Sequence, residues 1–518
     1  MTVSCHTQVC EPLDARSAIR RASPLHVSKR ILLILSLLLS GVLTFSACKG
    51  SGRPGRTLEL EPCQLSAPTT QERLAAKCGV LKVPSDRKTG QGKTLDIHVA
   101  VLEATSGKAA PDALMLIAGG PGQSAISTFT PIMQLFERSR RSRDVVLVDI
   151  RGTGRSHLLQ CPEPPNPLEE GTLDDTREQT QHCLDQLQDD PRHFTTVAAM
   201  QDLDAVREAL GYPQVTLFGH SYGSRAALVY MRMFPEKVRA AILSGVAPPH
   251  QTHYQHSARF MDQLLEGMFS RCKNDAACHE AFPQLEGELA QLLAQLEKAP
   301  ATVKLQHPRT GKDLEVPLSR EGLAGLLLRL SYSTTTLAML PVLIHSGVTE
   351  QDLRPLAAQG LMTNPGMEDI AVGLNASMTC SEDRRLLDLE KARAEAQGSL
   401  FGTLAVDHFT ARCEIWPAGE LLREDALQPV VSAIPTLLLS GELDPVTPPE
   451  SAEAALAHLS KGRHIVVKDA AHDAFSRGCT PRLMAEFINK GQHEGLDVTC
   501  LEQQPPIPFF LNRLGPRP

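Results

Sequence analysis

One serine lies in a glycine-flanked sequence that is typical of a catalytic nucleophile. Ser221 stands in the pentapeptide GHSYG (219–223), between the apolar run 214–218 and the helical stretch 225–234. In a G-x-S-x-G turn that joins a strand to a helix, the hydroxyl is exposed at the sheet edge and the next backbone N–H faces a developing oxyanion. We therefore predict that Ser221 is a nucleophile; the alternative is a tight turn around a buried serine.

A serine nucleophile needs a base and an orienting acid, because the pKa of its hydroxyl is too high for unaided attack. Asp444 follows the apolar run PTLLLSG, and His472 follows the run HIVVK 28 residues later. Serine, acid, histidine is one of the orders in which such triads occur along a chain. We predict the triad Ser221–Asp444–His472. Asp473 is the rival acid, although adjacent residues rarely direct a carboxylate at the neighbouring imidazole.

A glycine-rich corner offers a second oxyanion donor. The run 113–117 ends in the sequence AGGPG (118–122), where glycines allow a backbone N–H to approach a substrate carbonyl. We expect the N–H groups of Gly120 and Tyr222 to form the oxyanion hole. The alternative is a plain Gly-Pro turn.

The elements that must position these residues alternate between short apolar runs and helical stretches. Residues 95–101 alternate in the manner of a half-buried strand, and the apolar runs lie at 113–122, 144–154, 214–223, 240–249, 434–444 and 463–473. Continuous apolar runs of five or six residues fit buried parallel strands. Between 250 and 430 the pattern is helical, as in 285–299, and the segments 320–332 and 383–398 are similar. We predict an α/β fold with a mostly parallel sheet, helices on both faces and an interrupting helical cap.

The same reading divides the chain into six parts. They are a signal peptide with a long n-region (1–47), a tether (48–60), the first part of the core (61–249), a helical cap (250–430), the second part of the core (431–490) and a tail (491–518).

Composition and charge exclude several classes of protein. The 518 residues are 42% hydrophobic and 21% charged, which is ordinary for a globular chain and excludes disorder as the main state. The formal net charge is −7, and it becomes −10 without residues 1–47, which carry five basic and two acidic side chains. An acidic chain is not attracted electrostatically to the phosphates of nucleic acid, so nucleic acid is not expected as a partner.

The amino-terminal segment indicates export. The apolar run 31–43 follows Lys29 and Arg30, a pattern typical of a secretory signal peptide. The alternative is a permanent anchor helix, although the uncharged stretch barely spans a bilayer core. The long n-region also fits a translation start at Val27. The sequence Phe45-Ser46-Ala47-Cys48 resembles a bacterial lipoprotein processing site, which implies a lipidated Cys48 and a membrane anchor.

The cysteines indicate disulfides in an oxidising compartment. Cys5 and Cys10 lie in the segment that is removed, and Cys48 is expected to carry lipid. Ten cysteines then remain, an even number that favours disulfides. No CxxC pair occurs and no histidine has metal-ligand spacing, so a metal site is disfavoured. The simplest scheme pairs them in order: 63–78, 161–183, 272–278, 380–413 and 479–500.

Several motifs together resemble one enzyme family. They are CGVLKVP (78–84), GGPG (119–122), DIRGTGRS (149–156), GHSYG (219–223) and GELDPVTP (441–448). They resemble the serine exopeptidases of the proline iminopeptidase and tripeptidyl aminopeptidase type, which have the α/β-hydrolase fold. The segments TCSED (379–383) and CEIWP (413–417) look like cap markers of the secreted tripeptidyl aminopeptidase branch. The resemblance covers about residues 60–480.

The resemblance implies removal of residues or tripeptides from the free amino end of a peptide, without a cofactor. Cap carboxylates would hold the α-ammonium, and Glu382 and Asp383 are the candidates. The alternative is an exposed helix start with Ser381 as its N-cap. Asp149 and Arg151 are expected to brace the loops beneath the site.

Two departures from the family pattern disfavour proline specificity. Ala118 stands where iminopeptidases carry histidine, and aromatic residues make up only 4% of the chain. Two other functions remain open: a carboxylesterase or lipase with the same machinery, and a non-catalytic binding lipoprotein. The sequence leaves open whether one residue or three are released.

Overall fold

The computed structural model describes residues 56–66, 73–162, 171–362 and 370–516. The expected signal peptide, Cys48, Cys5 and Cys10 lie outside the described residues. No helix within the described residues is long and apolar enough to cross a bilayer.

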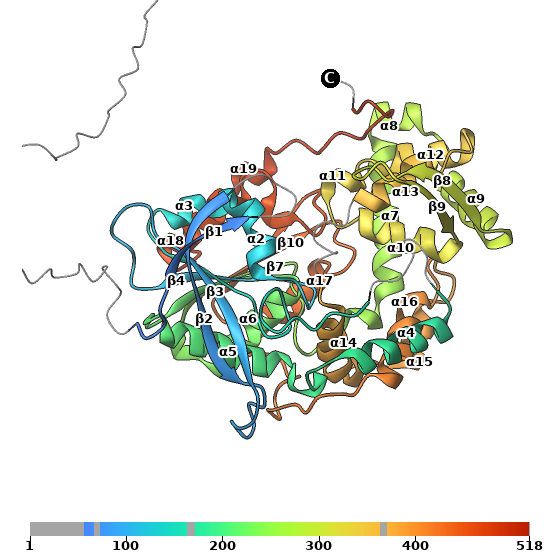
Figure 1. Cartoon of the computed structure of the whole chain (residues 1–518). Coiled ribbons are helices and arrows are strands. Elements are labelled where there is room, and N and C mark those ends of the chain that lie inside the picture. Colours follow the sequence, from blue (N-terminus) through green and yellow to red (C-terminus); the bar gives the residue numbers. More distant parts are fainter. Residues whose placement is uncertain (1–55, 67–72, 163–170, 363–369, 517–518) are drawn as a thin grey trace, which may run out of the picture. The chain divides into compact units, whose positions relative to one another are not determined.

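A nine-stranded sheet runs through the described chain in the order β1-β2-β3-β5-β4-β6-β7-β10-β11 (Figure 1). Its strands are β1 (Glu61–Ser66), β2 (Arg73–Pro84), β3 (Thr94–Leu102), β4 (Ala113–Ile117), β5 (Val145–Val148), β6 (Val215–His220), β7 (Val238–Ser244), β10 (Thr436–Gly441) and β11 (Gly462–Val467). The six strands from β5 to β11 pair in parallel, and β1 to β3 extend the sheet in antiparallel fashion. The prediction of a mostly parallel sheet is confirmed.

Burial explains which strands the sequence predicts. Every residue of β4, β5 and β10 is buried, because helices cover both faces, and these strands are continuous apolar runs. By contrast, most residues of β1 are exposed and most residues of β2 are half-buried, and neither strand shows a continuous apolar run or regular alternation. They were therefore not predicted.

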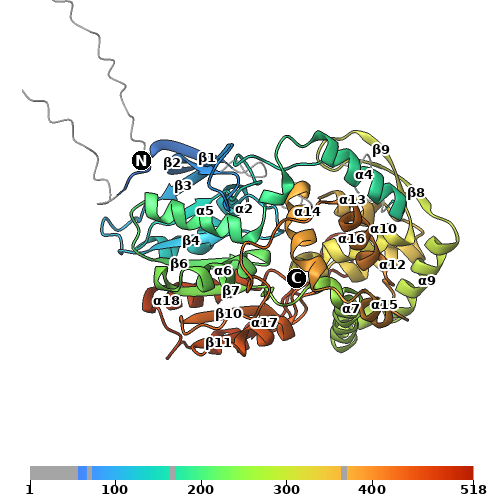
Figure 2. The ribbon, with the colours of Figure 1, turned by 90° about the horizontal axis from the view of Figure 1, so that it is seen from below.

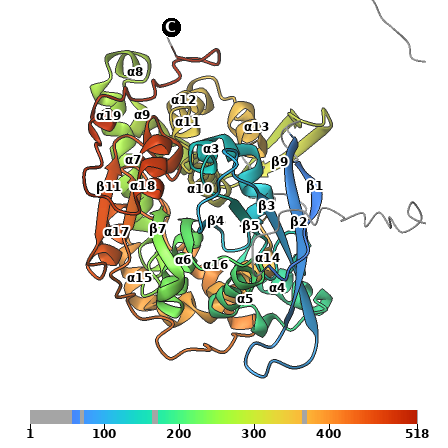
Figure 3. The same ribbon diagram turned by 90° about the vertical axis from the view of Figure 1, so that its left-hand side faces the viewer.

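Helices cover both faces of the sheet, as expected (Figure 3). One apolar layer joins the sheet to α5, α6 and α17, and the other joins it to α2, η1 and α18. The helices of this part, with η marking 3-10 turns, are α2 (Ala125–Phe129), η1 (Thr130–Phe136), α3 (Glu137–Arg140), α4 (Leu173–Gln186), η2 (Pro191–His193), α5 (Thr196–Ala209), α6 (Tyr222–Met233), η3 (Pro235–Lys237), α17 (Pro449–Leu456), η6 (Ala474–Ser476), α18 (Thr480–Lys490) and α19 (Thr499–Glu502).

The segment between β7 and β10, here called the cap, is mainly helical and has an apolar core of its own (Figure 2). Its helices are η4 (His253–Gln255), α7 (Ser257–Asn274), α8 (Ala276–Ala281), α9 (Leu285–Lys298), α10 (Arg320–Leu330), α11 (Thr334–Leu337), α12 (Leu340–Thr349), α13 (Arg354–Met362), α14 (Val372–Ser381), η5 (Asp383–Arg385), α15 (Leu389–Glu395) and α16 (Leu404–Ile415). The expected helices at 285–299 and 320–332 are present as α9 and α10.

Two features of the cap differ from the sequence prediction. A hairpin of β8 (Ala301–Gln306) and β9 (Asp313–Leu318) follows α9, and its alternating Val303, Val316 and Leu318 face the cap core. The segment 383–398 is not one helix but the turn η5 followed by the short helix α15.

Helix α4 packs against the cap although it precedes β6 in the chain. Thr176 of α4 contacts His408 of α16 over 2.7 Å, and Arg177 bonds to Glu414. Figures 1 and 2 both place α4 beside α16. The cap layer is thus completed by a helix that the sequence assigned to the core.

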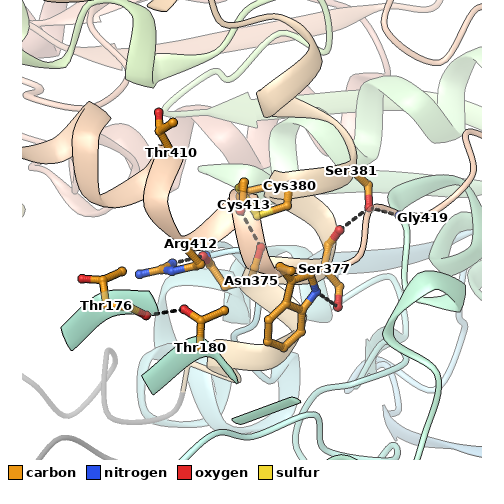
Figure 4. Close-up of a disulfide and its surroundings, with 12 residues drawn as sticks. Thr176, Thr180, Asn375, Ser377, Cys380, Ser381, Thr410, Arg412, Cys413 and Gly419 are labelled. Carbon is orange, nitrogen blue, oxygen red and sulfur yellow. Dashed lines mark hydrogen bonds between the residues drawn. A yellow bond between two sulfur atoms is a disulfide. The ribbon is translucent and has the colours of Figure 1, made fainter. Parts of the chain in front are cut away.

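Five disulfides pair the remaining ten cysteines in sequence order: Cys63–Cys78, Cys161–Cys183, Cys272–Cys278, Cys380–Cys413 and Cys479–Cys500. This confirms the sequential scheme. Cys380–Cys413 joins α14 to α16 (Figure 4). It shares one small apolar cluster with Cys161–Cys183 and with Trp416, the only tryptophan of the chain.

Candidate active site

Ser221 occupies a sharp turn between β6 and α6. Its φ of 57° lies in the left-handed region, which is rare for a residue with a side chain and is common at functional sites. The N–H of Ser221 donates to the carbonyl of Ser244 over 2.8 Å and fixes this conformation. A Cβ on Gly223 would lie 2.2 Å from the carbonyl oxygen of Ile117, so glycine is needed for α6 to approach β4. The turn has the form that the G-x-S-x-G pattern predicts.

Asp444 and His472 meet because they follow β10 and β11, which are parallel neighbours. His472 Nδ1 lies 2.7 Å from Asp444 Oδ2, and both side chains are buried. Asp444 Oδ1 accepts the N–H groups of Val446 and Thr447, each over 2.9 Å. Burial alone would raise the pKa of Asp444, but the charge and hydrogen bond of His472 and these N–H donors together lower it. The carboxylate is therefore held in its charged form.

Thr447 is a part of this site that the sequence analysis missed. Its hydroxyl donates to Asp444 Oδ2 over 2.8 Å and also lies 3.1 Å from His472 Nδ1. The position of Thr447, three residues after the acid at the start of a turn, is the signal that could have identified it. The Thr447 hydroxyl and the His472 imidazole thus both bind Oδ2 of Asp444 and hold the carboxylate in place.

The other imidazole nitrogen remains available for a proton. Nε2 of His472 is buried and has no hydrogen-bond partner among the described residues. The ring lies between His220, at 4.7 Å between centroids, and Tyr332, at 5.2 Å. Ser221 and His472 both line a cavity of about 520 Å³. A proton carried on Nδ1 and held by Asp444 leaves Nε2 as an acceptor that faces the nucleophile's cavity.

The two residues predicted to supply the oxyanion donors, Gly120 and Tyr222, lie at the same cavity as Ser221. Tyr222 is the first residue of α6, where an N–H has no partner within the helix. A Cβ on Gly119 would lie 3.0 Å from the Cβ of Ser221, so this glycine brings the loop after β4 close to the nucleophile. This arrangement can polarise a carbonyl held at Ser221.

Asp473, the rival acid, has different partners. Its carboxylate accepts the hydroxyl of Ser333 over 3.3 Å and the N–H of Thr334 over 3.2 Å. Both donors belong to the start of α11, so Asp473 anchors that cap helix to the core. Its carboxylate is thereby directed at the cap, whereas the carboxylate of Asp444 is directed at the imidazole.

The two cap carboxylates are separated in the structure. Helix α14 ends at Ser381, and both Glu382 and Asp383 are buried, so the alternative of an exposed helix start is wrong. Asp383 lines the cavity and binds the guanidinium of Arg225 over 2.9 and 3.1 Å.

Glu382 is directed away from the cavity. Its carboxylate accepts the N–H and the hydroxyl of Thr196, each over 2.8 Å. Burial raises the pKa of Glu382, against the smaller opposing effects of Arg225 and Thr196. Arg225, which the sequence analysis missed, follows Ser221 by one helical turn, and that spacing is the signal for its position.

Asp149 and Arg151 lie beneath the site and do not line the cavity. Asp149 accepts the hydroxyl of Ser124 over 2.6 Å, and burial raises the pKa of Asp149. The guanidinium of Arg151 binds Asp202 over 2.7 and 2.9 Å, and it also donates to three backbone carbonyls, those of Pro84, Ser85 and His193. These contacts hold the neighbouring loops together, which is the role expected for Asp149 and Arg151. Within the described ranges, no group of three or more His, Cys, Asp or Glu residues could hold a metal ion.

Comparisons with known proteins agree with this geometry. Residues 112–347 match the family model described as "alpha/beta hydrolase fold", and residues 398–500 match the model described as "TAP-like protein". Serine protease Hip1 of Mycobacterium tuberculosis is 25% identical over 513 residues, which cover 91% of this chain and 98% of that protein. Tripeptidyl aminopeptidase of Streptomyces lividans is 23% identical and covers 83% of this chain and 85% of its own. Proline iminopeptidase of Arabidopsis thaliana is 25% identical over 43% of this chain and 46% of its own.

Proposed function

This chain belongs to the α/β-hydrolase fold family of peptidases, and we propose that it is an exported serine aminopeptidase. It removes residues or short peptides from the free amino end of a peptide. The observation that carries the proposal is the strained turn at Ser221 beside the buried pair of His472 and Asp444. Nε2 of His472 has no hydrogen-bond partner among the described residues and can accept a proton.

The reaction follows from the positions of these groups. Ser221 Oγ attacks the scissile carbonyl carbon while His472 Nε2 takes the hydroxyl proton. The N–H groups of Gly120 and Tyr222 receive the oxyanion that develops on the carbonyl oxygen. The intermediate collapses when His472 returns the proton to the leaving amine, and the amino-terminal part stays attached to Ser221 as an ester. Water then attacks that ester, with His472 as base, and the second product leaves.

Asp444 and Thr447 act on the base rather than on the substrate. Hydrogen bonding to Nδ1 keeps the imidazole in the tautomer whose Nε2 can accept a proton. The carboxylate, which is charged because its pKa is lowered, stabilises the imidazolium that forms in the reaction.

Selection for a free amino end is assigned to Asp383. Its carboxylate lines the same cavity as Ser221, and a carboxylate has more acceptor positions than its two bonds to Arg225 use. A substrate ammonium can therefore share the carboxylate. Cap residues line the part of the cavity that holds Asp383. This favours the end of a peptide as substrate over the middle of a folded protein.

The proposed location is the cell envelope, outside the cytoplasm. Five disulfides are typical of a protein from an oxidising compartment. The proposal includes lipidation of Cys48 after removal of residues 1–47 and a membrane anchor through that lipid. Labelling with a radioactive fatty acid tests this part: incorporation should be lost in C48A, and incorporation that persists in C48A contradicts it.

The test of the catalytic proposal is a peptide-library digest by the purified mature protein, with S221A as the control. We expect cleavage only near free amino ends, with fluorophosphonate labelling of the native chain but not of S221A. Parallel assays with short acyl esters examine the alternative: turnover of esters without turnover of any peptide would make the chain a carboxylesterase. The absence of both turnover and labelling would favour the non-catalytic binding lipoprotein.

A further inference from the structure

A second chamber of about 370 Å³ lies within the cap, next to the catalytic cavity. The two spaces share five lining residues, namely His253, Tyr254, Phe260, Tyr332 and Val446. Val446 bonds to Asp444, and the ring of Tyr332 packs edge-on against the ring of His472. The chamber therefore opens directly beside the catalytic base.

The walls of the chamber are mostly apolar and are held firmly. Side chains from α7, α10 and α16 form them, including Met261, Leu328 and Phe409. The ring of Tyr254 is stacked on the ring of Phe409, with centroids 3.8 Å apart and planes within 8°. A volume of this size surrounded by apolar side chains can enclose the stem of a long side chain.

The ionisable side chains around the chamber are all basic. Arg329, Arg412 and His408 line it, and no Asp or Glu is found among its described lining residues. Arg412 donates to the amide oxygen of Asn375 over 3.5 Å and forms no ion pair within the described ranges (Figure 4). Guanidinium groups at the edge of an apolar space favour a carboxylate there, because an ionic interaction is stronger where water is excluded.

The catalytic cavity has the opposite character. Three carboxylates line it, those of Asp383, Glu450 and Asp473, together with one guanidinium, that of Arg225, which is paired with Asp383. Carboxylates therefore outnumber guanidinium groups in the cavity, whereas the chamber has guanidinium groups and no carboxylate among its described lining residues. An ammonium is favoured in the cavity, and an anionic group is favoured in the chamber.

We propose that the chamber is a specificity subsite for an acidic side chain, foremost glutamate, in the amino-terminal part of the substrate. The inference rests on the proposed aminopeptidase function. The methylene groups of the side chain lie against the apolar wall, and its carboxylate meets Arg412 and Arg329. A lysine or arginine at the same substrate position is disfavoured by like charge.

The test uses anilides of matched peptides that differ only in Glu, Gln or Lys at each position before the scissile bond. At one position we expect kcat/KM for Glu to exceed that for Gln by about 10- to 100-fold, as charged hydrogen bonds allow. In R412Q this ratio should fall close to one. The matched control is R393Q, on neighbouring α15, because Arg393 pairs with Asp407 and does not line the chamber. Its ratio should equal that of the native chain.

A binding measurement separates the subsite from catalysis. Calorimetry with S221A should show tighter binding of the Glu-containing tripeptide than of its Gln counterpart, and R412Q in the same background should remove the difference. R329Q repeats the test on the second guanidinium if R412Q does not fold. Peptides that are cleaved without a preference for Glu, or with one for Lys, overturn the subsite and leave the proposed function intact. Cleavage of no peptide overturns the proposed function and the subsite with it.

Discussion

Asp383 of the cap and Arg225 of the core form a buried ion pair, with two N–O distances of 2.9 and 3.1 Å. Their side chains are only 6% and 7% exposed. Arg225 lies in α6, one turn after Ser221, so the pair connects the cap to the helix whose first turn holds the nucleophile and an oxyanion donor. Under the proposed function, binding of a substrate ammonium by Asp383 would therefore be linked to the position of the reacting groups.

Loss of the Asp383 charge should cost both stability and affinity. D383N leaves the Arg225 guanidinium buried without a counter-charge, and removal of one partner of such a pair destabilises a protein by about 3–5 kcal/mol. Chemical denaturation measures this, and the double variant D383L/R225M should recover part of the loss. For the folded variant we expect a higher KM for peptides with a free amino end. Equal denaturation midpoints for D383N and the native chain would show that the pair contributes nothing.

The Thr447 hydroxyl should affect the turnover rate rather than substrate binding. T447V removes the hydrogen bond to Asp444 with little change in shape, and we expect kcat to fall about tenfold while KM changes little. T447S restores the hydroxyl and should restore most of the rate. A kcat for T447V equal to that of the native chain, with correct folding, contradicts the positioning role of Thr447.

Glu382 makes the stability depend on pH in a defined direction. Burial raises its folded pKa above the ordinary value of 4.5, so the favourable contribution of the protonated group is complete below that value. It is lost as the pH rises through the raised folded pKa. Relative to E382Q, which stays neutral, the native chain should therefore lose stability as the pH rises above about 4.5 and through the raised folded pKa. Denaturation midpoints of both proteins at several pH values test this; a difference that does not change with pH contradicts it.

The turn at Ser221 should not tolerate a methyl group at Gly223. G223A places a Cβ 2.2 Å from the carbonyl oxygen of Ile117, so the strand and helix must separate. We expect a loss of about 2–3 kcal/mol in the free energy of unfolding and loss of activity. G287A is the matched control, because Gly287 lies in α9 with no atom within 4 Å of the added Cβ. It should gain about 0.5–1 kcal/mol through helix propensity.

The disulfide between α14 and α16 should stabilise the cap. Removal of a bridge that closes a loop of this size, with a sequence separation of 33, costs about 2–4 kcal/mol. C380A/C413A should therefore unfold at a lower denaturant concentration. Because Trp416 is the single tryptophan and packs in the same cluster, its emission follows unfolding of this region. The control C272A/C278A removes a cap disulfide outside that cluster, and the native emission maximum should be retained.

The sequence predicts those parts of the fold whose burial leaves a periodic pattern. The runs at β4, β6 and β10 are mostly apolar because both faces of the sheet are covered, and each leads into a turn that carries Gly120, Ser221 or Asp444. Position after a strand, together with residue type, is the basis on which the sequence predicts a role for these residues. The partly exposed strands β1 and β2 leave no such pattern.

Roles that depend on distant partners could not be predicted in the same way. Asp383 and Arg225 are separated by 158 positions, and only the contact between η5 and α6 in the folded chain shows that one neutralises the other. The sequence does not distinguish the neighbouring acids Glu382 and Asp383 as candidates for binding the substrate ammonium. Their side chains diverge because the backbone passes from the end of α14 into η5, which directs Glu382 to Thr196 and Asp383 to the cavity.

The order of the disulfides has a consequence for how the chain matures. Every bridge joins a cysteine to the next one along the chain, at separations of 6 to 33 residues. In a polypeptide that emerges from a translocation channel amino end first, each cysteine meets its native partner before any other unpaired thiol arrives. Under the proposed export, this order of emergence would favour the native connectivity over the alternatives.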